Sequence, residues 1–354
     1  MQRNRFERKE ILLVLVLSLL VLFAVELILR TIPNASRKIK QYGWATQGNI
    51  KYRKMVKDSP GNTVEVIVEY FDYGFKRWGD PNTQKVKMFI IGDSYTQMDR
   101  VSNGEEWYSF LEKELNLELF VYGAGGYGSL QEYMVLNDFI DKIKPDLIIL
   151  QFCDNDFENN LYELDLSKYP YNSNGYRPYL EKGKIVYRKP VPLCGLRKYS
   201  FVADRILQAY DKIAKGRVTR NLLAYNKQMA KKLESAPEKE KERIRLLNDR
   251  AFGVTNKIMA MIRKRTKGIP VYFYGVYFSN NSRAEKLSEL NNFIYIPVVA
   301  ELVNANKEGI CLRVVNDGHW NKMGNRLVGE GLVAYFKKAG ISKISVPVSG
   351  MSTN

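Results

Sequence analysis

Residues 86–96 read VKMFIIGDSYT, in which an apolar run of strand length ends in Gly92, Asp93 and Ser94. A backbone-permissive glycine, a carboxylate and a hydroxyl therefore stand where a strand turns into the next element. In α/β proteins the loops at the carboxyl ends of parallel strands surround the ligand crevice. A serine held there can present its hydroxyl to a substrate, so Ser94 is the candidate nucleophile. Taken alone, the tripeptide is more typical of a turn with a helix-capping serine, and the rest of the chain must decide.

Strand-like and helix-like segments alternate outward from this stretch. Residues 117–122 and 146–152 are short apolar runs of strand length, and residues 105–115 and 130–143 have apolar residues at helical spacing. A half-buried strand is predicted before them at 63–70. Further along, the pattern predicts a helix at 251–264, a strand at 271–276, mainly helix over 288–304, a fifth strand at 310–315 and a helix at 322–338. This order predicts a parallel sheet with right-handed crossovers.

Polar loops follow four of the predicted strands, and together they contain the parts that acyl transfer needs. They hold Ser94, the glycine loop at 123–128, Asn155, and Asp317 with His319. A serine nucleophile needs an imidazole base, and the imidazole needs a partner that fixes its tautomer. Glycine N–H groups and an asparagine amide can stabilise the tetrahedral oxyanion. His319 is the only histidine, so it is the only imidazole base available, and a multi-histidine metal site is excluded.

Cofactor and metal sites are not expected. The glycine loop resembles nucleotide-binding loops, but no acidic ribose ligand or Walker lysine follows it. Cys153, Cys194 and Cys311 form no CxxC pair and have no metal-ligand spacing, so neither a zinc site nor a disulfide framework can be argued. Cys153 is a rival nucleophile in principle, although a small residue packed below the loop is the favoured interpretation.

The N-terminal region carries one long apolar stretch. Residues 11–29 are nearly unbroken aliphatic sequence, and about 19 residues at helical rise match a bilayer core. A cleaved signal peptide is the alternative, but its apolar part should be shorter and should end at small residues, unlike AVE at 24–26. We therefore expect a retained anchor over residues 1–32, followed by a polar, basic stem over 33–60. Basic residues flank both ends of the stretch, so charge alone gives no orientation.

The chain carries a formal net charge of +17, which indicates anionic surroundings or an anionic partner. An insertion at about 159–250 interrupts the α/β rhythm, and within it residues 177–189 are predicted to form a hairpin around Lys182 and Gly183. Within residues 182–250 there are 19 Lys and Arg against 7 Asp and Glu. This basic region either caps the crevice or contacts an anionic surface, and the alternative is a solvated face of amphipathic helices. A nucleic-acid groove is not expected.

A family resemblance follows from these motifs. Gly92-Asp93-Ser94, the glycine loop, Asn155-Asp156 and the terminal Asp-Gly-His resemble, in order, the four blocks of the SGNH (GDSL-type) hydrolase superfamily. The resemblance covers about residues 70–336. The adjoining pieces FDYGFKRW, GYGSLQEY, KPDLIIL and RPYLEKGKIV are similar to a bacterial, membrane-anchored, extracytoplasmic branch.

The resemblance implies a fold and a division of the chain. The implied fold is a flavodoxin-like three-layer α/β sandwich with a five-strand parallel sheet, preceded by one transmembrane helix. The hydrolase domain would occupy residues 61–340, with a tail at 341–354. The implied chemistry is that of a metal-free esterase or O-acyltransferase.

Carried over by position, the resemblance also implies roles for individual residues. Ser94 would be the nucleophile and would donate its own N–H to the oxyanion. Gly126 would add a backbone N–H, Asn155 its side-chain amide, and His319 would be the base.

The chain departs from the family pattern at three positions. The acid usually stands three residues before the histidine, where this chain has Asn316, whereas Asp317 stands two before. An Asp-x-His spacing is similar to that of some polysaccharide O-acetyltransferase relatives, so Asp317 is the expected acid and Asn316 the alternative. Cys153 replaces a usual glycine, and Val121 replaces a frequent asparagine.

We therefore expect a membrane-anchored serine esterase or O-acyltransferase that acts on O-acyl groups, most plausibly O-acetyl, of a cell-envelope polysaccharide. One alternative is a lipid esterase or thioesterase, which the anchor and the cationic surface suggest. Another is a glycan-binding module of the same fold that has lost its chemistry, which the displaced acid and Cys153 suggest. Placement of the domain outside the cytoplasm rests on the resemblance.

Overall fold

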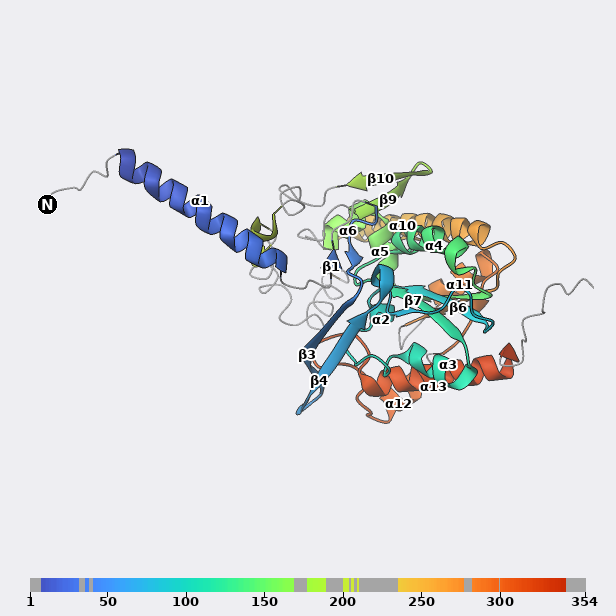
Figure 1. The fold of residues 1–354 in the computed structure, drawn as a ribbon. Helices are drawn as coiled ribbons and strands as arrows, with labels where there is room; N and C mark the ends of the chain where they lie inside the picture. The colour runs from blue at the N-terminus through green and yellow to red at the C-terminus, as the bar shows by residue number, and fades with distance from the viewer. Residues whose placement is uncertain are drawn as a thin grey trace, which may run out of the picture.

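The computed structural model describes residues 8–31, 36–37, 41–168, 177–188, 200–203, 205–206, 209, 235–276, 282–298 and 300–341. Cys194, most of the expected tail and much of the basic region lie outside the described residues. A central six-stranded sheet has the order β12-β11-β8-β6-β7-β5 (Figure 1). Its strands are β5 (Arg77–Trp78), β6 (Lys87–Gly92), β7 (Glu118–Gly123), β8 (Leu147–Phe152), β11 (Val271–Gly275) and β12 (Ile294–Tyr295).

Five of these strands are parallel, and the two-residue β5 pairs with β7 in the antiparallel sense. The parallel part has the expected flavodoxin-like order, so the predicted fold class is confirmed. The strands β6, β7 and β8 are each apolar except for one residue, because both faces of the sheet are covered. The sequence-based ranges for these three strands agree with the structure to within two residues.

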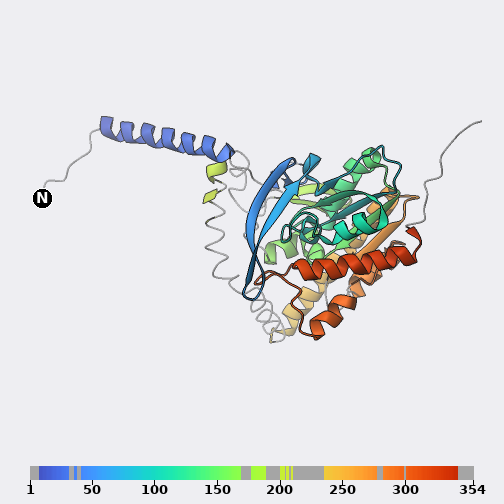
Figure 2. The same cartoon turned by 60° about the horizontal axis from the view of Figure 1, so that its bottom comes forward.

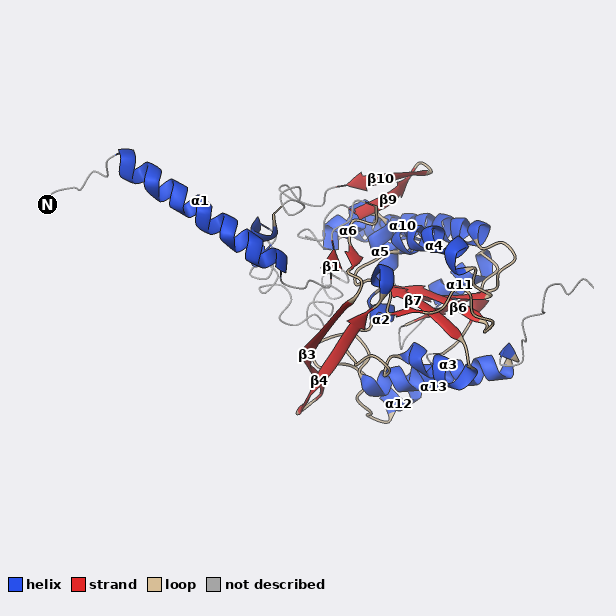
Figure 3. Ribbon diagram, viewed as in Figure 1, coloured by secondary structure: helices blue, strands red, loops and turns tan. Residues whose placement is uncertain are grey.

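Helices cover the sheet on both faces, as Figure 3 shows. One apolar core joins the sheet to α4 (Ser129–Ile143), α10 (Glu238–Arg265) and α11 (Ser282–Leu290). The opposite core joins it to α3 (Trp107–Leu115), α12 (Ala300–Lys307) and α13 (Lys322–Lys338). Successive residues of a strand pack into opposite cores. In β6, Phe89 and Ile91 pack into the first core, and Met88 and Ile90 pack into the second.

The fifth parallel strand is not where the sequence pattern places it. The prediction of a strand at 310–315 and of mainly helix over 288–304 is wrong. The short strand β12 interrupts the range 288–304. Residues 310–315 make only one isolated bridge, between Arg313 and Trp320. Within residues 310–321, the Val314 N–H donates to the His319 carbonyl and the Asn321 N–H donates to the Leu312 carbonyl. Leu312 and Val314 are buried, whereas Ile310 and Cys311 are exposed, and none of these residues joins the sheet.

Part of the expected stem at 33–60 is folded. The strands β1 (Ser36–Arg37) and β2 (Ala45–Thr46) pair with each other, and β3 (Ile50–Ser59) forms an antiparallel hairpin with β4 (Asn62–Tyr70). Tyr42 and Trp44 are buried in the core beside α4. These apolar side chains explain why the segment packs onto the domain instead of forming a linker.

The hairpin β3–β4 braces two loops at the edge of the sheet. The Val315 N–H donates to the Lys57 carbonyl at 2.9 Å, and the Asn321 amide donates to the Asp58 carbonyl at 3.1 Å. The two hydroxyls of Tyr52 and Tyr70 donate to Asp99 at 2.9 and 2.7 Å. The hairpin therefore fixes the loop that contains Asp317 and His319 as well as the loop after Ser94.

The helices α5 (Asn155–Asn160) and α6 (Tyr162–Lys168) follow β8, and a hairpin of β9 (Arg177–Glu181) and β10 (Lys184–Arg188) follows them. The predicted hairpin around Lys182 and Gly183 is thus present. The charged segment before residue 250 and the helix predicted at 251–264 form one continuous helix, α10. The N-terminal helix α1 (Arg8–Thr31) projects away from the domain in Figures 1 and 2.

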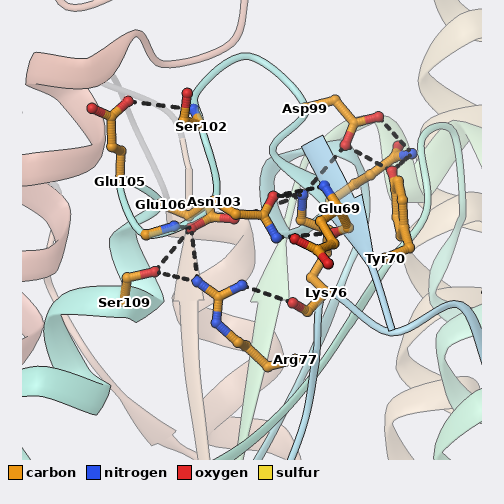
Figure 4. Close-up of polar contacts among 12 residues, drawn as sticks. Glu69, Tyr70, Lys76, Arg77, Asp99, Ser102, Asn103, Glu105, Glu106 and Ser109 are labelled. Atoms are coloured by element: carbon orange, nitrogen blue, oxygen red, sulfur yellow. Dashed lines mark hydrogen bonds and ion pairs between the residues drawn. The ribbon is translucent and has the colours of Figure 1, made fainter. Parts of the chain in front are cut away.

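A buried ion network lies beside the hairpin, as Figure 4 shows. Lys76 is fully buried, with its Nζ 3.0 Å from the Asn103 Oδ1, 3.6 Å from the Glu106 Oε1 and 3.7 Å from the Asp99 Oδ1. Arg77 adds a hydrogen bond of 3.2 Å to Glu106. Burial by itself would raise the pKa of the Glu106 carboxyl, but the charges of Lys76 and Arg77 outweigh burial and lower it. The network joins β5 to the loops before α3.

Replacement of Lys76 by methionine is expected to destabilise the fold by about 3–5 kcal/mol, because it leaves buried carboxylates without their counter-charge. Urea unfolding of the full chain in detergent, followed by tryptophan fluorescence, measures the change. Lys51→Met is the matched control, since Lys51 forms an exposed ion pair with Glu69 and its loss should cost less than about 1 kcal/mol. Equal effects of the two substitutions would contradict a structural role for the buried network.

Candidate active site

Ser94 begins the short helix α2 (Ser94–Gln97) directly after β6. Asp93 caps this helix, because its Oδ1 accepts the Tyr95 N–H at 2.9 Å. The Asp93 side chain is fully buried, whereas Ser94 is half-buried. The strand and the cap therefore hold the Ser94 backbone in place at the carboxyl end of the sheet, where α/β proteins bind their ligands.

His319 lies against Ser94 although the two residues are far apart in the chain. The His319 Nε2 is 2.7 Å from the Ser94 Oγ, and the His319 Nδ1 makes a short hydrogen bond to the Asp317 Oδ1. The Tyr95 hydroxyl donates to the Gly318 carbonyl at 2.8 Å and fixes the backbone between Asp317 and His319. The three side chains thus form a continuous hydrogen-bonded chain from hydroxyl to imidazole to carboxylate, the arrangement that activates a serine.

Asp317 has a second polar partner that sequence analysis missed. The Arg100 Nε donates to the Asp317 Oδ2 at 2.6 Å. Partial burial would raise the pKa of Asp317, but the hydrogen bond and charge of His319, together with Arg100, lower it well below its usual range. The carboxylate therefore stays ionised across the neutral pH range. No sequence pattern links Arg100 to Asp317, because they come from loops 217 positions apart.

Asn316 occupies the turn that delivers Asp317. It is exposed and takes a left-handed backbone conformation (φ 59°), which asparagine tolerates better than most residues. The Asp317 N–H donates to the Val314 carbonyl and closes this turn. Of the two candidate acids, Asp317 is the one that the structure brings to the imidazole.

The glycine loop lies against Ser94 on another side. A side chain at Gly125 would place its Cβ 3.8 Å from the Ser94 Cβ and 2.9 Å from the Gln97 Oε1. The Gly125 N–H donates to that Gln97 oxygen at 2.6 Å, and its carbonyl accepts from the Trp44 indole. Within the described part of the chain, the N–H of Gly126 has no acceptor. Gln97 and Trp44 hold the loop, and sequence analysis identified neither.

Asn155 is the first residue of α5, after β8, and is half-buried. Burial raises the pKa of Asp93, the neighbour of Ser94, and the Asn155 side chain is among the groups that oppose this rise. The structure thus brings Asn155 to the site through Asp93.

Two further buried carboxyls lie beneath this edge of the sheet. Burial raises the pKa of Glu132 in α4 well above its usual range, and the charge of Asp93 adds to the effect. Burial and the charge of Glu132 do the same to Asp156. The Asp156 Oδ2 accepts the N–H of Cys153, which is itself buried. Both carboxyls therefore hold their protons to a higher pH than an exposed carboxyl does.

Glu132→Gln is expected to stabilise the fold at pH 8 and to have little effect at pH 4. The folded protein holds a proton on Glu132 that the unfolded chain releases above about pH 4.3, so the wild type loses stability as pH rises through this range. A gain of about 1 kcal/mol corresponds to a rise in Tm of about 2–4 °C in a domain of this size. Thermal unfolding at the two pH values measures the gain.

The control is Glu65→Gln, since Glu65 lies on the surface in an ion pair with Arg53. Its Tm change should be small and equal at both pH values. A Glu132→Gln variant that is less stable than wild type at pH 8 would show that the wild-type carboxyl is ionised.

Comparisons with known proteins add family evidence to this geometry. A family model described as GDSL-like lipase/acylhydrolase matches residues 88–332. No curated protein matches the chain. Among solved structures, the psychrotrophic esterase EstA from Pseudoalteromonas sp., inhibited by monoethylphosphonate, is 12% identical, with 72% of this chain and 98% of that chain covered at a TM-score of 0.37.

Two other solved structures are similar in the same range. A family 3 carbohydrate esterase from Clostridium thermocellum is 10% identical, with 73% of this chain and 98% of that chain covered at a TM-score of 0.39. A catalytic mutant of an acetylxylan esterase from Geobacillus stearothermophilus is 11% identical, with 70% and 92% covered and a TM-score of 0.35.

Proposed function

The chain belongs to the GDSL-like lipase/acylhydrolase family and is an ester hydrolase, and from this premise we propose that it removes or transfers O-acetyl groups of a cell-envelope polysaccharide while anchored in the membrane. The single observation that carries the chemistry is the hydrogen-bonded chain of Ser94, His319 and Asp317.

In the proposed mechanism the Ser94 Oγ attacks the ester carbonyl as the His319 Nε2 takes its proton. Asp317 holds the imidazole in the required tautomer and stabilises the imidazolium. The tetrahedral oxyanion accepts hydrogen bonds from the N–H groups of Ser94 and Gly126 and from the Asn155 amide. His319 then protonates the leaving alkoxide, which frees the alcohol and leaves an acyl-enzyme.

The second half-reaction distinguishes hydrolysis from transfer. His319 deprotonates either water or an acceptor hydroxyl, which attacks the acyl-enzyme and releases Ser94. Transfer requires that the acceptor exclude water from the crevice.

The surroundings of Ser94 support a short acyl group. Gly125 lies against the Ser94 side chain and is itself bound by the polar Gln97, and the polar His319 contacts the Ser94 hydroxyl. A long alkyl chain would need an apolar channel beside the nucleophile, so these neighbours favour acetyl over a fatty acyl group.

Helix α1 supports the membrane part of the proposal. Residues Lys9–Leu29 have a mean hydropathy of 3.1 and are unburied in the structure. Exposed apolar surface of this extent is unusual for a domain in water. A signal sequence has a similar composition, so N-terminal sequencing of the membrane-bound protein distinguishes a retained anchor from a cleaved leader.

We expect p-nitrophenyl acetate to be hydrolysed with a higher kcat/KM than the octanoate ester. Each methylene that fits a complementary apolar pocket is worth about 1–3 kcal/mol, so a lipid esterase would show the reverse order. Release of acetate from an O-acetylated polysaccharide, with and without an added acceptor glycan, then tests hydrolysis against transfer. A preference for octanoate would favour the lipid esterase alternative.

A further inference from the structure

Glu26 makes a contact that links the membrane helix to the basic region. It lies in α1, three residues before the end of the apolar stretch at Leu29. Its carboxylate accepts hydrogen bonds of 3.0 Å each from the Ser200 hydroxyl, the Phe201 N–H and the Val202 N–H. These donors come from a segment more than 170 positions further along the chain, so the contact is tertiary and not local.

The contact supplies hydrogen-bond donors to the Glu26 carboxylate, which lies within an apolar helix. A carboxylate within a membrane helix is costly unless it reaches water or hydrogen-bond donors, and even near the end of the helix it needs partners. Hydrogen bonds to an ionised acceptor are about twice as strong as neutral ones. Ser200 also accepts the Ala203 N–H at 3.1 Å, so the donor turn is itself ordered. Glu26 is accordingly half-buried, although the α1 residues next to it are exposed.

The position of Glu26 fixes the depth of this turn. At a rise of about 1.5 Å per residue, Glu26 lies about 4.5 Å inside the end of the apolar stretch. Hydrogen bonds of 3.0 Å place residues 200–202 at nearly the same depth. If α1 spans the bilayer, these residues lie at the boundary between hydrocarbon and headgroups.

The side chains of this segment suit such a boundary. Phe201 and Val202 are half-buried, the Ile206 side chain is 62% exposed, and Arg205 is exposed on the same short stretch. Apolar side chains beside a long cationic one are typical of segments that lie in the interface plane.

We propose that residues 200–203 and 205–206 form a membrane-docking segment that Glu26 holds at the exit of α1, and that the partner of this surface is the lipid bilayer. The inference rests on the proposed anchoring and adds to it that this short segment lies on the membrane. The catalytic domain is then held directly on the bilayer surface, and cleavage of α1 would remove the hydrogen-bond acceptor of the segment.

The test uses the full chain reconstituted in vesicles of phosphatidylcholine, with or without bromine near the headgroup end of the acyl chains. Phe201→Trp adds a reporter to the proposed segment, and the parent chain supplies the background of its four native tryptophans. We expect the added emission to be largely quenched by the brominated lipid. Tyr187→Trp, on the exposed strand β10, is the matched control and should lose little emission.

The role of the Glu26 carboxylate in holding the segment is tested in the same Phe201→Trp background. Glu26→Ala should remove most of the quenching, whereas Glu10→Ala, near the other end of α1, should leave it unchanged. Unquenched emission from Trp-substituted position 201 in a chain that resists carbonate extraction would overturn the docking. Quenching that persists in Glu26→Ala would overturn the role of Glu26.

Hydrolysis of p-nitrophenyl acetate in the same vesicles separates this proposal from the proposed function. An active, inserted chain without quenching overturns the docking alone. Extraction of the wild-type chain by carbonate overturns anchoring and docking together and leaves the esterase assignment in place. A quenched but inactive chain contradicts the proposed catalytic function while supporting the docking.

Discussion

Replacement of Ser94 by alanine is expected to lower kcat for p-nitrophenyl acetate by about 10⁴- to 10⁶-fold, because removal of the nucleophile of a serine triad leaves only binding and oxyanion stabilisation. The reason is geometric, since the Ser94 Oγ is the one hydroxyl placed 2.7 Å from the His319 Nε2. A fluorophosphonate probe should label the wild type and leave Ser94→Ala unlabelled. Initial rates with a matched protein concentration measure the loss.

Thr96→Ser provides a control for changes beside the nucleophile. Thr96 is fully buried and its hydroxyl donates to Gln151, away from His319. The conservative change keeps that hydroxyl, so labelling and rate should persist. A Ser94→Ala protein that folds normally and retains wild-type turnover would refute the assignment of Ser94.

Asp317→Asn is expected to lower kcat by about 10⁴-fold, as in serine triads where the acid is replaced by its amide. The amide cannot stabilise the imidazolium, and it favours the wrong imidazole tautomer. Because the lowered pKa keeps Asp317 ionised, the acidic limb of the wild-type pH profile should not come from this residue. Steady-state rates from pH 5 to pH 9 measure both effects.

Asn316→Gly is the matched variant for the neighbouring position. Glycine accepts the positive φ of this turn without strain, so the rate should change by no more than about twofold. The opposite result, a large loss of rate in Asn316→Gly and a normal rate in Asp317→Asn, would assign the role of the acid to Asn316 and contradict the geometry of the site.

The sequence predicts the centre of this fold better than its edges. The strands at 87–92, 118–123 and 147–152 are visible because sheet strands covered on both faces are continuously apolar. The two-residue strand β12 has too few residues to leave a periodic signal. The run ICLRVV at 310–315 has the composition of a strand, yet its backbone bonds to its own loop and to the Lys57 carbonyl of the hairpin and not to the central sheet, so tertiary contacts override propensity.

The same division applies to the site. Ser94, Asp317 and His319 could be proposed from the sequence because residue types and their order limit which residues can be nucleophile, acid and base. The roles of Arg100 and Gln97 could not be predicted, because their hydrogen-bond partners lie on other loops that meet only in the folded domain. Tyr42 and Trp44 could have indicated that part of the expected stem is folded, since two large aromatic residues are unusual in a solvated stem.

The brace formed by β3 and β4 has a consequence for when the enzyme becomes active. The Lys57 carbonyl, which leaves the ribosome well before the loop of His319, binds that loop in the folded domain. Ser94 has no imidazole beside it until residue 319 has been synthesised and the two segments have met. A partly synthesised chain therefore carries a serine without its base, and ester hydrolysis begins only once this part of the domain has closed.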